Sequence, residues 1–133
     1  MLRVSEHLRA HLLASLGVPE GPRRPMPDLD LLSVTEWSPE FERLCRNRLI
    51  VGAFRYGRLG GPDKWRAAGG RRHDLIGGAR MKLDLYEQTG NQEHLVDLAN
   101  YALLEFVHPS RPGAYFHAED DQRHCPVAAK RSL

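Results

Sequence analysis

Residues 74–109, DLIGGARMKLDLYEQTGNQEHLVDLANYALLEFVHP, decide the fold because they contain the start, the turn and the end of a helix pair. Asp74 is suited to cap a helix that we expect to continue to about Gln88. Thr89-Gly90-Asn91 predicts a tight turn, and its asparagine can cap a second helix that runs to about Val107. The His-Pro pair that follows ends this second helix. The stretch therefore predicts two helices joined by a short turn.

The second helix of this pair is apolar around most of its circumference. Its broad apolar arc comprises Leu95, Val96, Leu98, Ala99, Ala102, Leu103 and Phe106. A helix of this kind is expected to be covered by other elements on most sides. In the first helix of the pair, Gly77-Gly78 lowers the helix propensity, which indicates a close approach of the backbone to another helix or to a ligand.

The rest of the chain supplies further helices and no strand pattern. Ser38-Pro39-Glu40 is a strong helix start, and this helix is expected to run to Phe54 or Tyr56. A helix from Ser5 to about Leu16 precedes a proline-rich linker. We therefore predict an all-α fold, a helical bundle of about four helices. Residues 1–36 form an N-terminal helical arm and Pro-rich linker, residues 37–109 the helical core domain, and residues 110–133 an irregular C-terminal tail.

Composition and charge exclude several classes of protein. With 19 Lys and Arg against 17 Asp and Glu, the formal charge of +2 argues against a dedicated DNA-binding protein. The two cysteines are far apart in the chain and fit neither a disulfide framework nor a zinc knuckle. Charged residues interrupt the first 18 positions, which excludes a signal peptide, and no apolar run is long enough to span a membrane. These features predict a cytoplasmic protein without a membrane partner.

One polar face of the second helix of the pair is a candidate metal site. Glu93 and Asp97 are four residues apart and Asp97 and Asn100 three, so their side chains share a face. Carboxylate and amide oxygens suit Mg²⁺. Glu42, from the helix that begins after Ser38, is a candidate for the third ligand. In the alternative, purely structural interpretation, Asp97 and Asn100 bond to Arg or Tyr side chains of neighbouring helices. On either interpretation we expect both to be at least partly buried and close to Arg80 or to an arginine of the helix that begins after Ser38.

Basic and aromatic residues near this face are candidates for binding a nucleotide. Arg55 and Arg80 are suited to hold phosphates. Tyr56 or Tyr101 can pack against a base, with Asn100 beside them. Exposed arginines that only interact with solvent are the simpler explanation of the same pattern. No complete catalytic motif of the Walker A, GxSxG or HExxH type occurs, so the catalytic residues are unknown.

The helix pair resembles a family of small uncharacterised proteins from phages and bacteria. The resemblance rests on the Thr-Gly-Asn turn at 89–91 and on Leu-Val-Asp-x-Ala-Asn at 95–100. It extends to Glu105-Phe106, to Asn47-Arg48 and Arg55-Tyr56-Gly57 upstream, and to the Phe-x-Ala-x-Asp-Asp element at 116–121 downstream. It covers roughly residues 40–124. No activity is implied by this family, but membership would place the protein among phage-type accessory proteins.

A more distant resemblance is to the all-α nucleotide pyrophosphohydrolases of the MazG type. In these proteins carboxylates on helix pairs hold Mg²⁺ around a nucleoside triphosphate. Here Glu93 and Asp97 have a wider spacing than the family's pairs, and Glu40 and Glu42 do not reproduce the first pair. The resemblance implies a nucleotide-binding protein and, as its activity, Mg²⁺-dependent hydrolysis of a nucleoside phosphate. The alternative is a non-enzymatic accessory or regulatory protein that binds a nucleotide or a host protein.

We also expect the chain to form a homodimer. The predicted N-terminal arm has an apolar stripe behind a proline-rich linker, so it needs a surface to cover it. The nearly all-round apolar helix likewise needs more cover than one short chain provides. Pairing of helix hairpins across a two-fold axis is a common way to supply that cover.

Overall fold

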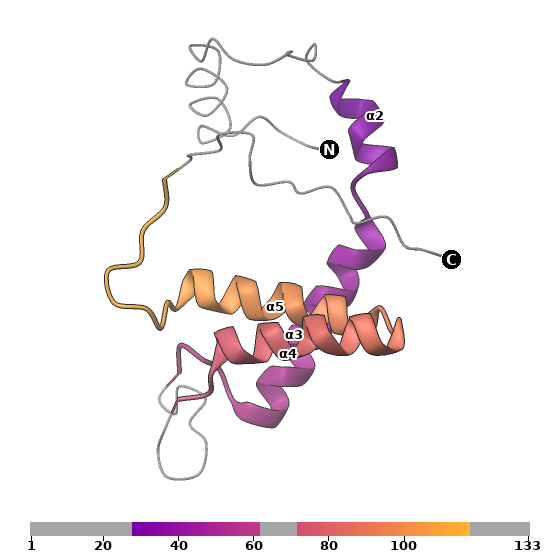
Figure 1. Ribbon diagram of the computed structural model, residues 1–133. Coiled ribbons are helices and arrows are strands. Elements are labelled where there is room, and N and C mark those ends of the chain that lie inside the picture. Colours follow the sequence, from indigo (N-terminus) through magenta and orange to yellow (C-terminus); the bar gives the residue numbers. More distant parts are fainter. Residues whose placement is uncertain (1–27, 62–71, 118–133) are drawn as a thin grey trace, which may run out of the picture. The chain divides into compact units, whose positions relative to one another are not determined.

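The computed structural model describes residues 28–61 and 72–117. The predicted helix from Ser5 to Leu16, the proline-rich linker and the end of the C-terminal tail lie outside these residues. Within them the chain forms four helices and no strand, so the all-α helical prediction is confirmed (Figure 1). The helices are α2 (Leu29–Thr35), α3 (Pro39–Tyr56), α4 (Leu75–Thr89) and α5 (Glu93–Val107).

The helix ends are fixed by the capping residues that the sequence indicated. Ser38 Oγ accepts a hydrogen bond from the amide of Phe41 at 3.0 Å, and Asp74 accepts one from the amide of Gly77 at 2.9 Å. Between α4 and α5, Gly90 adopts a left-handed conformation with φ of 70°, which glycine tolerates at little cost. Asn91 Oδ1 then accepts a hydrogen bond from the first amide of α5 at 3.0 Å.

The short helix α2 was not predicted, because its residues were included in the arm and linker. Asp28 caps it by accepting hydrogen bonds from the amides of Asp30 and Leu31, at 2.9 and 3.2 Å. The signal was therefore present as an Asp directly before an apolar run. Seven residues are too few to display a helical period clearly, which is why periodicity alone did not reveal this helix.

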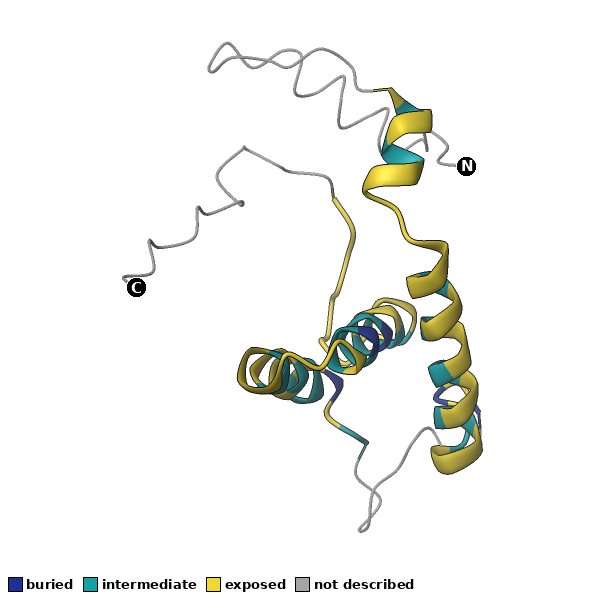
Figure 2. Ribbon diagram, turned by 90° about the vertical axis from the view of Figure 1, so that its right-hand side faces the viewer, coloured by how far each residue is buried: buried dark blue, intermediate teal, exposed yellow. Residues whose placement is uncertain are grey.

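The chain divides into two compact units, which are described separately. One is Ser38–Ala114, and the other consists of Met1–Trp37 and Tyr115–Leu133. In the first unit, α4 and α5 form an antiparallel hairpin, and α5 also packs against α3. α5 is thus the hairpin helix that contacts α3, and Figure 2 shows the hairpin end-on beside α3. All residues of the candidate site described below belong to this unit.

Very few side chains in the described residues are buried, as the small dark areas in Figure 2 show. The buried apolar residues are Leu59, Leu75 and Val96. The expectation that α5 is covered on most sides is not met by the described residues, since Phe106 is 71% exposed and Leu103 is also exposed. The physical reason is that only α3 and α4 pack against α5. None of the described helices is both long and apolar enough to cross a membrane.

Candidate functional site

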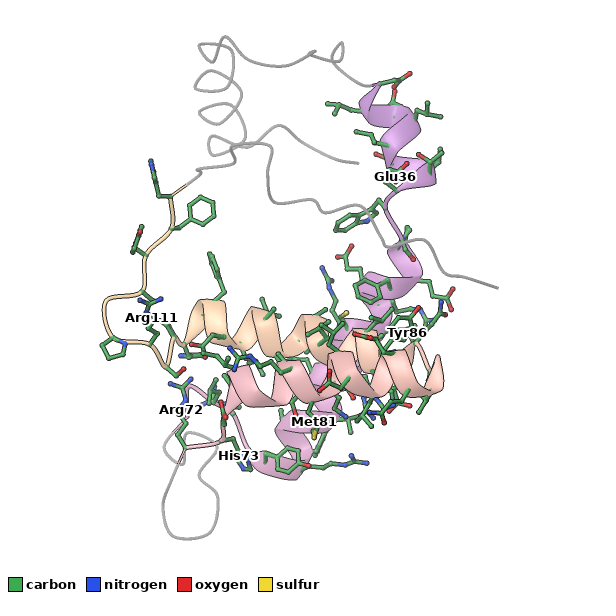
Figure 3. All side chains as sticks on the ribbon, viewed as in Figure 1. Glu36, Arg72, His73, Met81, Tyr86 and Arg111 are labelled. Carbon is green, nitrogen blue, oxygen red and sulfur yellow. The ribbon has the colours of Figure 1, made fainter. Side chains whose placement is uncertain are left out.

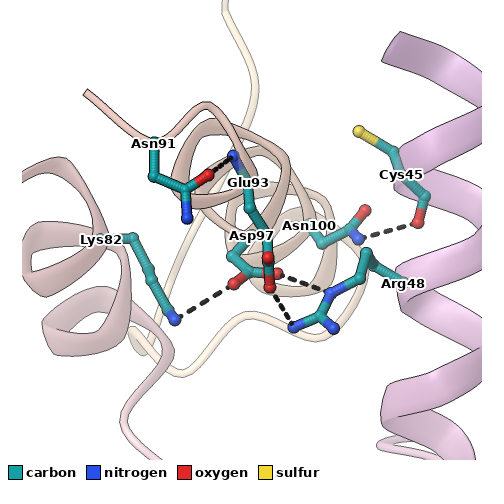
Figure 4. Close-up of polar contacts among 7 residues, drawn as sticks. All are labelled: Cys45, Arg48, Lys82, Asn91, Glu93, Asp97 and Asn100. Carbon is teal, nitrogen blue, oxygen red and sulfur yellow. Dashed lines mark hydrogen bonds and ion pairs between the residues drawn. The ribbon is translucent and has the colours of Figure 1, made fainter. Parts of the chain in front are cut away.

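An ion-pair network centred on Asp97 connects the three helices (Figure 4). Asp97, on α5, is only 12% exposed. Its two carboxylate oxygens contact different cations: Oδ1 lies 3.3 Å from Nε of Arg48 on α3, and Oδ2 lies 3.1 Å from Nζ of Lys82 on α4. One carboxylate thus bridges two partly buried cations and links both neighbouring helices to α5.

Arg48 also contacts a second carboxylate one turn away on α5. Its Nη2 atom lies 3.2 Å from Oε1 of Glu93. The spacing of Glu93 and Asp97 places both on the same face of α5, as predicted, and that face is directed at α3. The guanidinium is planar and carries several fixed donors, so it can contact two carboxylates at once.

Asn100 provides the other polar contact between α5 and α3. It is 8% exposed, and its Nδ2 atom donates a hydrogen bond to the carbonyl of Cys45 at 2.8 Å. Burial raises the pKa of the Cys45 thiol, and the negative charge of Asp97 raises it further. The thiol is therefore kept neutral and behaves as a small packing group. The prediction that Asp97 and Asn100 are partly buried is confirmed, as is the prediction of a nearby arginine from the helix that begins after Ser38, which is Arg48 of α3.

Beside this network lies a cleft of about 200 Å³ between α3 and the hairpin. Among the described residues, three cations, Arg48, Arg55 and Lys82, line it together with a single carboxylate, that of Asp97. The other lining residues are two tyrosines, an amide and a small apolar wall: Tyr56, Tyr101, Asn100, Leu49, Val51, Gly52 and Leu104. The lining therefore has a positive excess and aromatic groups within the same small volume.

Gly78 of α4 leaves room for the ring of Tyr101, which lies in the wall of the cleft. A Cβ atom on Gly78 would lie 3.1–3.3 Å from three ring atoms of Tyr101. The absent side chain thus lets the ring lie against the backbone of α4, which is the close helix approach that the sequence predicted. Gly77 has a different role, since a Cβ there would lie 2.2 Å from the capping carboxylate of Asp74.

The structure brings together most of the residues predicted to bind a nucleotide. Arg55, Tyr56, Asn100 and Tyr101 all line the cleft. Arg80 does not line it and is exposed on α4.

Two important cations, Arg48 and Lys82, were not predicted as site residues. Lys82 and Asp97 stand at nearly equal distances along the chain from the turn at Gly90. In an antiparallel hairpin such residues meet, so the turn position contained the signal that identifies the lysine.

The predicted metal ligands do not gather around a common point. Glu42 pairs with Arg46 at 2.7 Å, one turn along the same helix, while Glu93 and Asp97 pair with Arg48. Across residues 28–61 and 72–117, no group of three or more His, Cys, Asp or Glu side chains is placed to hold a metal ion. The carboxylates of α5 therefore serve as partners of cations in this structure, as the structural alternative anticipated.

A second hollow, of about 410 Å³, lies beside the cleft and shares Leu49 and Leu104 with it. Its other lining residues come from the end of α3, the following loop and His108, and they are mostly apolar. A Cβ on Gly60 would lie 2.9 Å from the His108 ring, so this glycine allows the loop to pass close to the end of α5. None of the described residues that line the hollow is a carboxylate.

The end of α5 is tied to the segments around it by hydrogen bonds. Glu105 Oε1 accepts hydrogen bonds from both the amide and the hydroxyl of Ser110 at 2.8 Å, and Arg72 donates to the carbonyl of His108. Arg72 and Arg111 lie at this end of the hairpin (Figure 3). Burial alone would raise the pKa of Glu105, but the hydrogen bonds from Ser110 and Arg111 and the charge of Arg72 lower it below its usual value.

Comparisons of the chain with protein-family models, with curated proteins and with solved structures found no match. Both family resemblances noted from the sequence therefore stay predictions. The function has to be inferred from the cleft and its residues.

Proposed function

We propose that this protein binds a nucleotide or a similar phosphorylated ligand in the cleft between α3 and the α4–α5 hairpin. The observation that carries the proposal is the lining itself: three cations against one carboxylate, with two tyrosines, in a cleft of about 200 Å³. Cations from two helices converging on one small volume favour an anion with several charged oxygens. The tyrosines offer faces on which a base can stack.

The ion pairs of Asp97 are compatible with phosphate binding and prepare the site for it. Asp97 orients Arg48 and Lys82 before any ligand arrives, which reduces the entropy lost on binding. A guanidinium has five N–H donors and an ammonium three, so both cations keep donors for a phosphate oxygen. Arg55 adds a cation for which no ion pair is found among the described residues, and it is exposed at the cleft.

The volume limits what the cleft encloses. Pockets that surround a whole drug-sized ligand usually measure about 300–1,000 Å³. At about 200 Å³ this cleft holds the phosphate part of a nucleotide, and the base stays at the opening beside Tyr56, which is itself exposed. We therefore expect modest selectivity among bases and strong dependence on the number of phosphates.

Binding without a catalytic step is the form of this function that the contacts support. Hydrolysis assisted by Mg²⁺ would need carboxylates available to the ion, whereas Glu93 and Asp97 are engaged by Arg48 and Lys82. We therefore propose a nucleotide-binding accessory protein, and include Mg²⁺ in the test so that a metal-dependent reaction would be detected.

Isothermal titration calorimetry of the full chain with nucleoside mono-, di- and triphosphates, with and without Mg²⁺, tests the proposal. The decisive variant is Arg55→Gln, which removes a cleft cation that makes no ion pair among the described residues. Loss of a charge-assisted hydrogen bond of about 1.5–3 kcal/mol predicts at least a tenfold weaker affinity. The matched control is Arg80→Gln, an exposed arginine on α4 outside the cleft, which should leave the affinity unchanged. No heat from any nucleotide, or equal losses in both variants, would refute the proposal.

A further inference from the structure

The apolar hollow beside the cleft has the depth of a pocket. Leu59 is the most buried of its lining residues, at 5% exposure. Leu49 and Leu104 are half-buried in its wall, and Ile50 is exposed at its rim. Its volume of about 410 Å³ lies within the range of about 300–1,000 Å³ that is usual for pockets of small ligands. The described side chains therefore leave room here for a bound group.

The course of the backbone after α3 contributes to this space. Gly57 ends the helix with φ of 77°, a left-handed conformation that favours glycine. A Cβ atom on Gly57 would meet no other atom within 4 Å, so the space beside it is open. The loop then returns towards α5, where Gly60 lies against the ring of His108. The hollow is thus enclosed by the end of α3, the loop and the end of α5.

The hollow and the cleft border each other along α3. Leu49 lines both spaces, Gly52 lines the cleft, and its neighbour Ala53 lines the hollow. Gly52 and Ala53 are three and four positions after Leu49, so the border follows one strip of the helix. On the opposite side Leu104 of α5 also lines both spaces. Because Gly52 and Ala53 are small, a group bound in the cleft can extend over them into the hollow.

The two spaces differ in chemistry. Cations dominate the cleft, whereas the only polar side chains among the described residues that line the hollow are those of Arg58 and His108. A nucleobase has donors and acceptors along its edge, and most of them would lose water in the hollow without gaining a partner. A hydrocarbon group has no such atoms and gains free energy from each methylene that leaves water. The lining therefore favours a hydrocarbon group. Arg58 is exposed, so its charge remains in water when such a group enters.

We propose that the ligand of this protein is an organic phosphate that carries a hydrocarbon group. Its phosphate lies among the cations of the cleft, and its hydrocarbon group lies in the hollow. This inference rests on the proposed binding of phosphate in the cleft and names the class of ligand. The base of a nucleotide of this class stays beside Tyr56, and the hydrocarbon group is a further substituent.

Calorimetry of the full chain with methyl, butyl, hexyl and octyl phosphate tests the inference. The series keeps one head group and lengthens only the chain. We expect each methylene that enters the hollow to raise the affinity up to about fourfold. Octanol, which lacks the phosphate, should give no measurable binding. Arg55→Gln should weaken the binding of every ester by a similar factor, because it changes only the cleft.

Ala53→Phe tests the place of the hydrocarbon group, because the larger side chain occupies part of the hollow. This variant should bind methyl and octyl phosphate with nearly equal affinity. The matched control is Ala102→Phe, which makes the same substitution at an exposed alanine of α5 that lines neither space. The control should keep the full dependence on chain length.

A second measurement needs no substitution and so stays decisive if Ala53→Phe unfolds. In nuclear magnetic resonance spectra of protein with labelled leucine methyl groups, hexyl phosphate should shift the signals of Leu59, whereas methyl phosphate should not. Leu103 is exposed on α5 and lines neither space, so its signals should shift with neither ester.

The outcomes separate this inference from the proposed function. If methyl phosphate binds and longer chains bring no gain, or if Ala53→Phe keeps the gain, the inference is overturned and the cleft remains a phosphate site. Octanol that binds as tightly as octyl phosphate also overturns it, because the hollow then acts without the cleft. If no phosphate of the series binds, the proposed function fails and the inference fails with it.

Discussion

The two sides of α5 differ in the kind of contact that they make. Towards α3 the helix presents Asp97 and Asn100, and each makes polar contacts with a named atom of α3. Away from α3 it presents Ala102 and Leu103, which are both exposed. Polar groups lose much free energy when they are buried without partners, so their geometry is specific. Apolar groups need only cover. The contacts of the first side are therefore specific, whereas those of the second side are not.

The largest predicted effect is the loss of stability that we expect when the ion pairs of Asp97 on the α3 side of α5 are removed. Asp97→Ala removes the carboxylate that Lys82 pairs with and leaves Arg48 with only the more exposed Glu93. Fully buried ion pairs cost about 3–5 kcal/mol when one partner is removed and surface pairs about 0–1 kcal/mol. Because Arg48 is 34% exposed, we expect an intermediate loss of about 2 kcal/mol in the free energy of unfolding, measured by urea denaturation.

Glu42→Ala is the control for that substitution. It also removes a carboxylate from an arginine, but the pair with Arg46 lies on the exposed surface of α3. Its loss should stay below about 0.5 kcal/mol. Nucleotide affinity separates the site hypotheses further. If cations hold the ligand, Asp97→Asn should weaken binding only modestly, because Arg48 and Lys82 keep their charges and lose only their orienting partner. A Mg²⁺-mediated site would lose binding. Equal destabilisation by the Asp97 and Glu42 variants would show that the network is only a surface feature.

Substitutions at the two adjacent glycines of α4 should have smaller effects, and only one of them should change nucleotide binding. Gly78→Ala gains up to about 1 kcal/mol of helix propensity but places a Cβ within 3.1–3.3 Å of the Tyr101 ring. The ring borders the cleft, so we expect it to shift by a few tenths of an ångström into that space. Thermal unfolding should change little, while calorimetry should show weaker nucleotide binding.

Gly77→Ala is the matched variant one residue earlier. Here the new Cβ would displace the Asp74 carboxylate from its capping position. The lost N-cap costs about 1 kcal/mol and offsets the helix propensity gained by the same substitution, so we expect little net change in stability and an unchanged nucleotide affinity. If the two variants gave the same pattern, the separate roles assigned to the two glycines would be wrong.

The sequence predicted the helices better than it predicted their contacts. Ser38, Asp74 and Gly90 are local signals, since each acts on the chain within a few residues, and α3, α4 and α5 were placed from them. Arg48 and Lys82 act across helices, so their partners depend on which faces meet. The hairpin turn predicts the pairing of Lys82 with Asp97, but nothing local to α3 indicates that Arg48 faces α5.

The difference between local signals and contacts across helices also explains how far the metal prediction could go. Glu93, Asp97 and Asn100 were correctly placed on one face of α5, because helical spacing fixes that relation. Whether such a face binds Mg²⁺ or pairs with cations depends on what the neighbouring helix contributes. Here α3 contributes Arg48, whereas Glu42 lies in the first turn of α3 and pairs with Arg46 instead.

The smallest expected effect concerns Glu105, which ties the end of α5 to Ser110. Hydrogen bonds from Ser110 and Arg111 and the charge of Arg72 outweigh burial and lower the pKa of this carboxyl. A carboxyl with a lower pKa in the folded state stabilises the protein above its unfolded pKa of about 4.3, and that contribution is lost as the pH falls through the folded pKa. Glu105→Gln keeps the shape of the side chain and removes its charge. Melting temperatures should therefore be higher for the wild type at pH 7, and this advantage should shrink between about pH 5 and pH 3. Glu40→Gln, at an exposed glutamate in the first turn of α3, provides the baseline for general acid effects. The difference in melting temperature between wild type and Glu105→Gln could instead stay constant across this range. That result would mean that the charge of Glu105 contributes nothing, and that its hydrogen bonds with Ser110 stabilise the end of α5 equally well when the side chain is neutral.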